Sequence, residues 1–199
     1  MGRHTGPKTK LCRRVGFLIF DNVGVEKAYL KRETVRFTRK QSEYGRRLLE
    51  KQKVMHAYGM REKQMRRFMD RARRMKGDTG HNFLILCERR LDNTVYSAGF
   101  APTRAAARQM ITHGQVRVND RKVDIPSALI HSGDTLTFRD KPNVKKLVKE
   151  CLERKSGYEP PDWIAVDGTS MTAKVVRLPL RDDVRLPIQE QLVVEFYSR

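Results

Sequence analysis

Cysteine, long apolar runs and secretion signals are scarce or missing in this sequence. Its 199 residues include three cysteines, Cys12, Cys87 and Cys151, whose wide spacing suits neither a disulfide framework nor a paired-cysteine metal site. No apolar stretch approaches the roughly 20 residues of a membrane span, and residues 1–8 lack the apolar segment of a signal peptide. We therefore expect an intracellular protein with reduced thiols and no membrane partner. Cys87, which follows the apolar run 83–86, should be a small buried hydrophobe.

Motifs of enzymes and metal sites are also missing. The chain has no Walker-type phosphate loop, no GxGxxG, no HExxH and no nucleophile elbow. Its five histidines are scattered, and none has a second ligand at metal spacing. We therefore predict a protein that is not an enzyme and that carries no metal and no cofactor. His113 lies near Arg108 and Arg117 in the sequence, so we take it as a candidate nucleic-acid contact.

Acidic residues are few relative to basic ones. Lys and Arg number 42 against 23 Asp and Glu, which gives a net charge of +19 and an isoelectric point near 10.3. Residues 1–76 hold 23 of the basic and 7 of the acidic residues, a net +16, whereas the remainder carries +3. Such an excess favours a polyanionic partner, most commonly nucleic acid, over solubilising surface charge, which is usually of mixed sign. The asymmetry predicts a basic arm or face on a more ordinary globular body.

The strongly basic first part of the chain contains two recognisable helical segments. Residues 1–16 have little to bury and should order only against a partner, and residues 17–41 show no sustained period, so we interpret 1–41 as a basic, irregular N-terminal arm. Residues 42–58 should form a helix capped by Ser42.

Residues 60–76 have the clearest helical pattern. The apolar residues fall on one stripe at 3.6-residue spacing, namely Met65, Phe68, Met69, Ala72 and Met75. The basic residues fall on the opposite arc, namely Lys63, Arg66, Arg67, Arg71 and Arg74. Only Glu62 and Asp70 relieve the repulsion among these cations, so a phosphate-rich partner is favoured over a merely solvated face.

From about residue 80 the chain mixes helical and strand patterns. Residues 116–118 and 121–123 should form a hairpin around Asn119-Asp120, and the tail 188–199 is ambiguous between helix and strand. Helices are further expected at 83–89, 91–98, 103–113 and 143–154, and strands at 135–138, 163–166 and 174–178. Trp163 could stack on a base, but its position at a strand favours a structural role.

Two helices followed by a basic hairpin, residues 91–123, would make a compact nucleic-acid-binding module. Arginine forks match phosphate geometry, and their planes stack on exposed bases. A small α+β fold with a charged rim would show the same pattern. The basic side chains that we expect to converge on one surface of this module are Arg104, Arg108, Arg117, Arg121 and Lys122.

Several collinear blocks of the sequence match one known family. The longest is RLDNTVYSAGFAPTRAAARQ at 90–109, and further blocks lie at 5–8, 50–53, 58–59, 62–64, 113–119, 125–127 and 190–199. On these residues the chain resembles the family of bacterial-type small-subunit ribosomal protein “S four”. The resemblance covers nearly the whole chain, with the exception of about residues 18–40.

The resemblance implies an α+β fold: a mostly helical domain and an RNA-binding domain of helices and a small antiparallel sheet. Residues 42–89, completed by 179–199, would form the first domain, with 188–197 as a helix, and residues 90–178 the second. The implied role is structural: primary binding to the 5′ domain of small-subunit rRNA, which nucleates assembly. The protein would then lie beside small-subunit proteins three and five near the channel through which mRNA enters, and would affect translational accuracy. Its location would be a cytoplasmic ribosome, with an organellar one as the alternative.

This sequence departs from the family in three places. Many relatives bind zinc through four cysteines, but here Cys12 is the one cysteine before residue 87, and one thiolate cannot hold the ion. Residues 34–40 replace a Pro-Gly-Gln-His-Gly stretch that is common in relatives. Asp120 fills a hairpin position that is often Gly, and Asp tolerates the positive φ required there.

The proposed contacts combine electrostatic docking with shape recognition. The candidate rRNA-binding residues are Arg3, Lys8, Lys10, Arg13, Arg14, Lys51, Lys53, Lys63, Arg66, Arg67, Arg71, Arg74, Arg104, Arg108, His113, Arg117, Arg121 and Lys122. By resemblance, the mRNA-facing candidates are Arg39, Lys40, Arg46 and Arg47.

Two other functions remain open at this point. The helix–helix–hairpin module also occurs in some pseudouridine synthases, whose catalytic Asp lies in an Arg-Leu-Asp context such as Arg90-Leu91-Asp92. Here that triplet lies inside the module's own first helix, so an Asp92 that caps the helix or pairs with a nearby Arg is favoured over an RNA-modifying enzyme. Repression of its own mRNA is a second alternative, implied for some members of the family.

Overall fold

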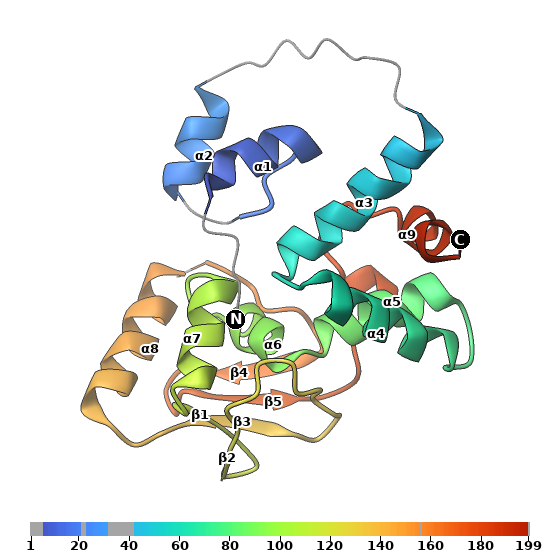
Figure 1. The fold of residues 1–199 in the computed structure, drawn as a ribbon. Coiled ribbons are helices and arrows are strands. Elements are labelled where there is room, and N and C mark those ends of the chain that lie inside the picture. The colour runs from blue at the N-terminus through green and yellow to red at the C-terminus, as the bar shows by residue number, and fades with distance from the viewer. Residues whose placement is uncertain (1–5, 21–22, 32–41, 156, 199) are drawn as a thin grey trace. The chain divides into compact units, whose positions relative to one another are not determined.

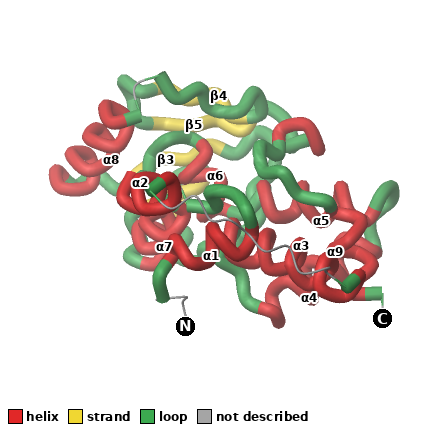
Figure 2. Tube along the Cα trace, turned by 90° about the horizontal axis from the view of Figure 1, so that it is seen from above, coloured by secondary structure: helices red, strands yellow, loops and turns green. Residues whose placement is uncertain are grey.

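The computed structural model describes residues 6–20, 23–31, 42–155 and 157–198. The chain divides into two compact units, one formed by residues up to Phe83 and from Leu186 onward, the other by Leu84–Arg185. The fold class is α+β, as predicted. Among the described residues, strands occur only in the second unit (Figures 1 and 2).

The first unit contains α1 (Lys8–Val15), α2 (Val23–Leu30), α3 (Glu43–Ala57), α4 (Glu62–Arg73), the start of α5 (Thr79–Glu88) and α9 (Glu190–Tyr197). Ser42 Oγ accepts a hydrogen bond from Gly45 N at 3.2 Å, which confirms the expected N-cap of α3. Helix α9 packs along α3 and also touches α4. The tail is therefore a helix, as the resemblance implied.

Helices α1 and α2 correct the expectation that residues 1–41 are irregular. In α1, Leu11, Cys12 and Val15 are buried, a spacing that places one apolar edge against α2 and α3. Gly16, at φ 91°, ends the helix. Only eight residues long and flanked by Pro and Gly, α1 is stabilised mainly by this packing and not by its own propensity.

The second unit contains α6 (Leu91–Ser97), α7 (Arg104–Thr112), β1 (Val116–Val118), β2 (Arg121–Lys122), β3 (Thr135–Phe138), α8 (Pro142–Arg154), β4 (Ile164–Asp167), β5 (Thr172–Val175) and a 3-10 turn at Arg181–Asp183. Its sheet is antiparallel with the order β2-β1-β3-β5-β4. Helices α6, α7 and α8 cover one face (Figure 1), and apolar residues from all three share a core with the strands. Trp163 is fully buried in this core, in agreement with a structural role.

The β1–β2 hairpin forms at the predicted turn. Asn119 and Asp120 have φ of 49° and 60°, as a two-residue turn with both central residues at positive φ requires. The Asn119 side chain donates to Asp134 Oδ1 at 2.8 Å and accepts from Thr135 N at 2.9 Å. These bonds fasten the turn to β3 and offset the strain of a left-handed Asp.

Strand β5 lies earlier in the chain than its apolar pattern predicted. The expected strand was 174–178, whereas β5 ends at Val175. Val176 N still donates to Trp163 O at 3.0 Å, and the chain then leaves the sheet before Pro179. Val176, Leu178 and Leu180 are consequently exposed, because apolar character alone does not mark where a strand loses its partner.

Candidate nucleic-acid interface

Helix α4 separates its apolar and basic residues onto opposite sides. Met65, Met69 and Ala72 are fully buried, and the helix places the five predicted cations together on the exposed side, namely Lys63, Arg66, Arg67, Arg71 and Arg74. The acidic residues do little to neutralise this surface. Glu62 accepts from Lys51 Nζ at 3.0 Å and from Tyr197 Oη at 2.9 Å, so its charge is already engaged. We call these five residues the α4 basic face.

The β1–β2 hairpin carries a second exposed basic group. Arg117 and Lys122 lie directly opposite each other in the register, and Arg121 and His113 are also exposed. Gly114 allows this arrangement, because it has φ of 64° and a Cβ there would collide with Lys122 Cε. The structure therefore brings these four predicted residues to one end of the second unit.

The outer face of the sheet continues this basic surface with a residue that sequence analysis missed. Arg117 pairs in register with Thr137, and Thr135, two residues earlier on the same face, pairs with Lys174. Lys174 is exposed. The alternation of Lys174 with buried Ala173 and Val175 was the available signal, but without the strand order nothing linked it to the hairpin.

Arg104 and Arg108 were predicted to lie on the same surface as the hairpin cations, but the structure places them elsewhere. Arg108 Nη2 lies 2.5 Å from Asp92 Oδ2, and Arg104 Nε donates to Asn93 Oδ1 at 2.7 Å while its guanidinium lies 4.4 Å from the Tyr96 ring centroid. The side chain of Arg108 is 19% exposed. Both residues lie on one face of α7, as expected, but that face packs on α6.

Asp92 is the centre of a buried ion cluster. Its side chain is 1% exposed, and Arg90, itself 2% exposed, donates to it twice, at 3.0 and 2.7 Å. With Arg108 on the same carboxylate, Asp92 binds two guanidiniums. A catalytic aspartate has to reach its substrate, so this burial supports the structural interpretation of Asp92.

Three predicted contacts of α3 are engaged within the first unit. Lys51 is buried, with Nζ 4.3 Å from the Phe196 ring centroid as well as bonded to Glu62. Lys53 pairs with Glu50 at 2.5 Å. Arg47 pairs with Glu195 at 2.6 Å and with Glu43 at 3.2 Å. The pairs Lys53–Glu50 and Arg47–Glu43 are local, but the pattern could not reveal the partner of Arg47 that lies 148 residues away. Arg46, by contrast, is exposed.

Of the described N-terminal candidates, two contact other residues of the first unit and two are exposed. Arg13 Nη2 donates to Ala28 O at 2.9 Å, and Lys8 Nζ lies 5.5 Å from the Phe20 ring centroid. Lys10 and Arg14 are exposed on α1. Three further candidates, Arg3, Arg39 and Lys40, lie outside the described residues.

Helix α8 presents lysines that were not among the predicted contacts. Val144 and Val148 are buried, while Lys145, Lys146 and Lys149 are exposed. Lys145 pairs with Asp140 at 2.8 Å. The spacing of these lysines is visible in the sequence. They were not predicted as contacts because the second part of the chain has a small net charge.

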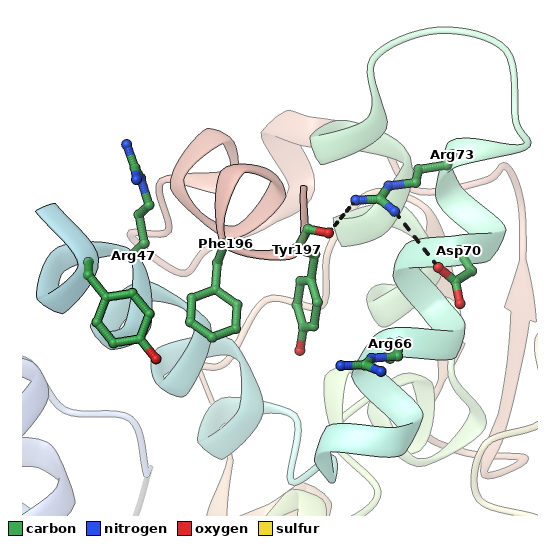
Figure 3. A pocket seen from close by; sticks show the side chains of 7 residues that line it. Arg47, Arg66, Asp70, Arg73, Phe196 and Tyr197 are labelled. Atoms are coloured by element: carbon green, nitrogen blue, oxygen red, sulfur yellow. Dashed lines mark hydrogen bonds and ion pairs between the residues drawn. The ribbon is translucent and has the colours of Figure 1, made fainter. Parts of the chain in front are cut away.

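The first unit also contains a pocket of about 510 Å³. Figure 3 shows Phe196 and Tyr197 of α9 between Arg47 of α3 and Arg66, Asp70 and Arg73 of α4. Tyr44 completes the lining. Burial, together with the hydrogen bond to Glu62, raises the pKa of Tyr197 well above its ordinary value, so this phenol stays a neutral donor.

Neither a metal site nor a membrane helix was found where the structure describes the chain. Within 6–20, 23–31, 42–155 and 157–198, no three His, Cys, Asp or Glu side chains come together in a way that could hold a metal ion. No helix in these ranges is long and apolar enough to cross a membrane. The three cysteines are free and buried, and burial raises the pKa of the Cys87 thiol far above its ordinary value.

Comparison with known proteins gives matches along the whole chain. Residues 3–88 match the model of the ribosomal protein S4/S9 N-terminal domain, and residues 89–136 match the S4 domain. Among curated proteins, small ribosomal subunit protein uS4 of Halothermothrix orenii is 43% identical over 208 residues, with all of both chains covered. The proteins of the same name from Trichlorobacter lovleyi and Thermoanaerobacter sp. (strain X514) are 43% and 42% identical, again over the full length of both chains.

Proposed function

We propose, since this chain belongs to the uS4 family of small ribosomal subunit proteins, that it is a structural constituent of the small ribosomal subunit and binds its rRNA. The observation that carries the proposal is the α4 basic face. Five exposed cations on α4 and its C-cap repel one another. A phosphate backbone would screen that repulsion, and binding would gain affinity from release of the counterions condensed on the phosphates.

A second basic surface in the other unit supports the same proposal. Arg117, Arg121 and Lys122 of the hairpin are exposed beside His113, and Lys174 extends their surface along the sheet. Arginine guanidiniums in such a surface can fork onto phosphate oxygens and stack on unpaired bases. Two basic surfaces on one chain suit an RNA with several helices, because each can bind a different segment.

A more specific proposal concerns the rRNA target of the protein and its position in the small subunit. We propose the 5′ domain of the rRNA as its primary target, early binding that nucleates assembly, and a final position beside small-subunit proteins three and five. That position would lie near the channel through which mRNA enters, where exposed Arg46 is the remaining described candidate for an mRNA contact and where the protein would influence accuracy. Full-length similarity to the uS4 relatives is the support for these points.

The test is binding of the full-length protein to a transcript of the rRNA 5′ domain, titrated against salt. An unrelated RNA of equal length is the control. We expect selective binding to the 5′ domain and a steep negative slope of log affinity against log salt. Replacing Arg67, Arg71 and Arg74 by Gln should reduce the magnitude of that slope by about 0.9 for each phosphate that is no longer neutralised. Equal affinity for both RNAs would contradict specific rRNA recognition.

The alternative of an RNA-modifying enzyme has a separate test. Asp92 is buried between Arg90 and Arg108, which supports a role without catalysis. We expect the parent protein to leave the uridines of the 5′-domain transcript unmodified. Formation of pseudouridine by the parent, abolished by Asp92→Asn in a variant that still folds, would establish the enzyme instead.

A further inference from the structure

The pocket between α3, α4 and α9 combines a sizeable volume with aromatic and charged side chains. It is about 510 Å³ in volume, its lining includes three aromatic rings, and it carries three arginines with one aspartate. A volume of this size falls within the range of sites that hold a small organic group. It therefore needs an explanation beyond the charge of α4.

The aromatic rings form a row. The centroids of Tyr44 and Phe196 lie 5.9 Å apart, and those of Phe196 and Tyr197 lie 5.3 Å apart at a steep angle. Lys51 covers the Phe196 ring at 4.3 Å from within the unit. Tyr44 is 57% exposed, so its ring is the one open to a flat ligand.

The arginines differ in what they already bind. Arg47 is paired with Glu195 and Glu43, and Arg73 donates to Tyr197 O at 2.8 Å. Arg66 is exposed and makes no hydrogen bond or ion pair with any residue that the structure describes. Figure 3 shows Arg66 and Arg73 on the Tyr197 side of the pocket and Arg47 on the Phe196 side. Tyr44 neighbours Phe196 in the row of rings, so two of the three arginines lie at the end away from the Tyr44 ring.

We propose that this pocket binds one unpaired nucleotide of RNA, with its base against Tyr44 and its phosphate at Arg66 and Arg73. A purely anionic ligand would be repelled by Asp70, which lies 4.0 Å from Arg73. A nucleotide avoids this conflict, because the 2′-hydroxyl of its ribose can donate to a carboxylate. The proposal rests on the proposed RNA-binding function and adds to it a defined site for an unstacked base.

The test uses the full-length protein and a short unstructured oligoribonucleotide that contains one fluorescent purine analogue, whose emission is quenched by stacking. The same sequence closed into a duplex is the comparison probe. We expect quenching with the single strand and none with the duplex. Tyr44→Leu removes an exposed ring and no charge, so it should abolish the quenching and weaken single-strand binding roughly 5- to 150-fold.

A pair of variants on α4 separates the pocket from general electrostatics. Arg66→Gln and Arg71→Gln each remove one exposed cation from the same helix, but only Arg66 lines the pocket. Both should reduce the salt dependence of RNA binding to a similar extent. Only Arg66→Gln should reduce the quenching of the bound probe.

The outcomes keep this proposal distinct from the function on which it rests. Absence of quenching by the parent protein, or quenching that Tyr44→Leu leaves intact, would overturn the nucleotide site even if the rRNA 5′ domain still binds selectively. Loss of that selectivity in the transcript assay would instead overturn the proposed function. Displacement of the probe by an acidic peptide but not by unlabelled single-stranded RNA would also overturn the proposal, in favour of a protein partner.

Discussion

The carboxylate of Asp92 holds the guanidinium of Arg108, 16 residues further along the chain, with 2.5 Å between Oδ2 and Nη2. This ion pair joins α6 to α7, and the same carboxylate binds buried Arg90. Removal of Asp92 would leave the Arg90 guanidinium in the core without its counterion.

We therefore expect Asp92→Ala to lower the free energy of unfolding by about 3–5 kcal/mol. Urea denaturation followed by circular dichroism would measure it. The matched control is Glu150→Ala, which removes an exposed partner of Arg154 at 3.8 Å and should change stability by at most about 1 kcal/mol. Equal effects of the two substitutions would show that the Asp92 cluster is not a buried charge centre.

Gly114 links the backbone of the module to its basic hairpin. Gly114→Ala should destabilise the protein by about 1–2 kcal/mol because of its positive φ, and the exposed end of the Lys122 side chain would move aside from the new Cβ. Gly77→Ala, also at positive φ but with nothing near its Cβ, isolates the strain. Chemical denaturation would measure both variants; a Gly114→Ala variant as stable as the parent would contradict the strain at this position.

The contribution of Asp183 should depend on pH in a defined direction. Hydrogen bonds from Arg177, at 2.6 and 2.9 Å, are the main cause that lowers the pKa of Asp183 in the folded protein. The ordinary value is about 3.9. A depressed folded-state pKa gives stabilisation that is complete above the unfolded value and is lost as the pH falls through the folded one.

Thermal unfolding of Asp183→Asn at pH 6 and pH 3 would test this. We expect the variant to melt below the parent at pH 6 and the difference to shrink at pH 3. Asp182→Asn, at the exposed neighbouring position, should leave the melting temperature unchanged at both values. A difference for Asp183→Asn that grows toward low pH would contradict the assignment.

The N-cap of α3 provides a fourth prediction. Ser42→Ala removes the side-chain acceptor for Gly45 N and should cost about 1 kcal/mol of stability. Ser42→Asp keeps an acceptor and adds a favourable charge at the helix N-terminus, so its stability should equal or exceed that of the parent. Equilibrium denaturation would measure both, and equal destabilisation in the two variants would exclude the cap.

Periodicity was enough to find the elements whose packing is local. Helices α3, α4, α6 and α7 and the β1–β2 hairpin each have a repeating apolar face or a turn dipeptide within a few residues. Helix α1 was missed because its apolar edge spans only Leu11 to Val15. That edge is recognisable only once its packing against α2 and α3 is known. The end of β5 was misplaced because a strand ends where its neighbour ends, which no local pattern records.

Whether a predicted cation is exposed or paired within the protein could be judged from the sequence only where its neighbours in the fold are also its neighbours in the chain. The α4 basic face was found because its charges lie within one helix. Lys51, predicted as an rRNA contact, and Arg47, predicted as an mRNA contact, pair with Glu62 and Glu195, which only the fold brings to them. The bond of Arg104 to Asn93 was equally invisible in the sequence, because it depends on how α7 packs on α6.

The division of the chain into units has a consequence for the order of folding. Residues 84–185 form one unit from a continuous segment, whereas the helical unit needs residues from both sides of that segment. Gln189 N, for example, donates to Glu50 Oε2 across 139 positions of sequence. Closing so long a loop is entropically costly while the inserted segment is unfolded. The sheet-containing unit should therefore form first and shorten the loop, and α9 should dock on α3 as a late step of folding.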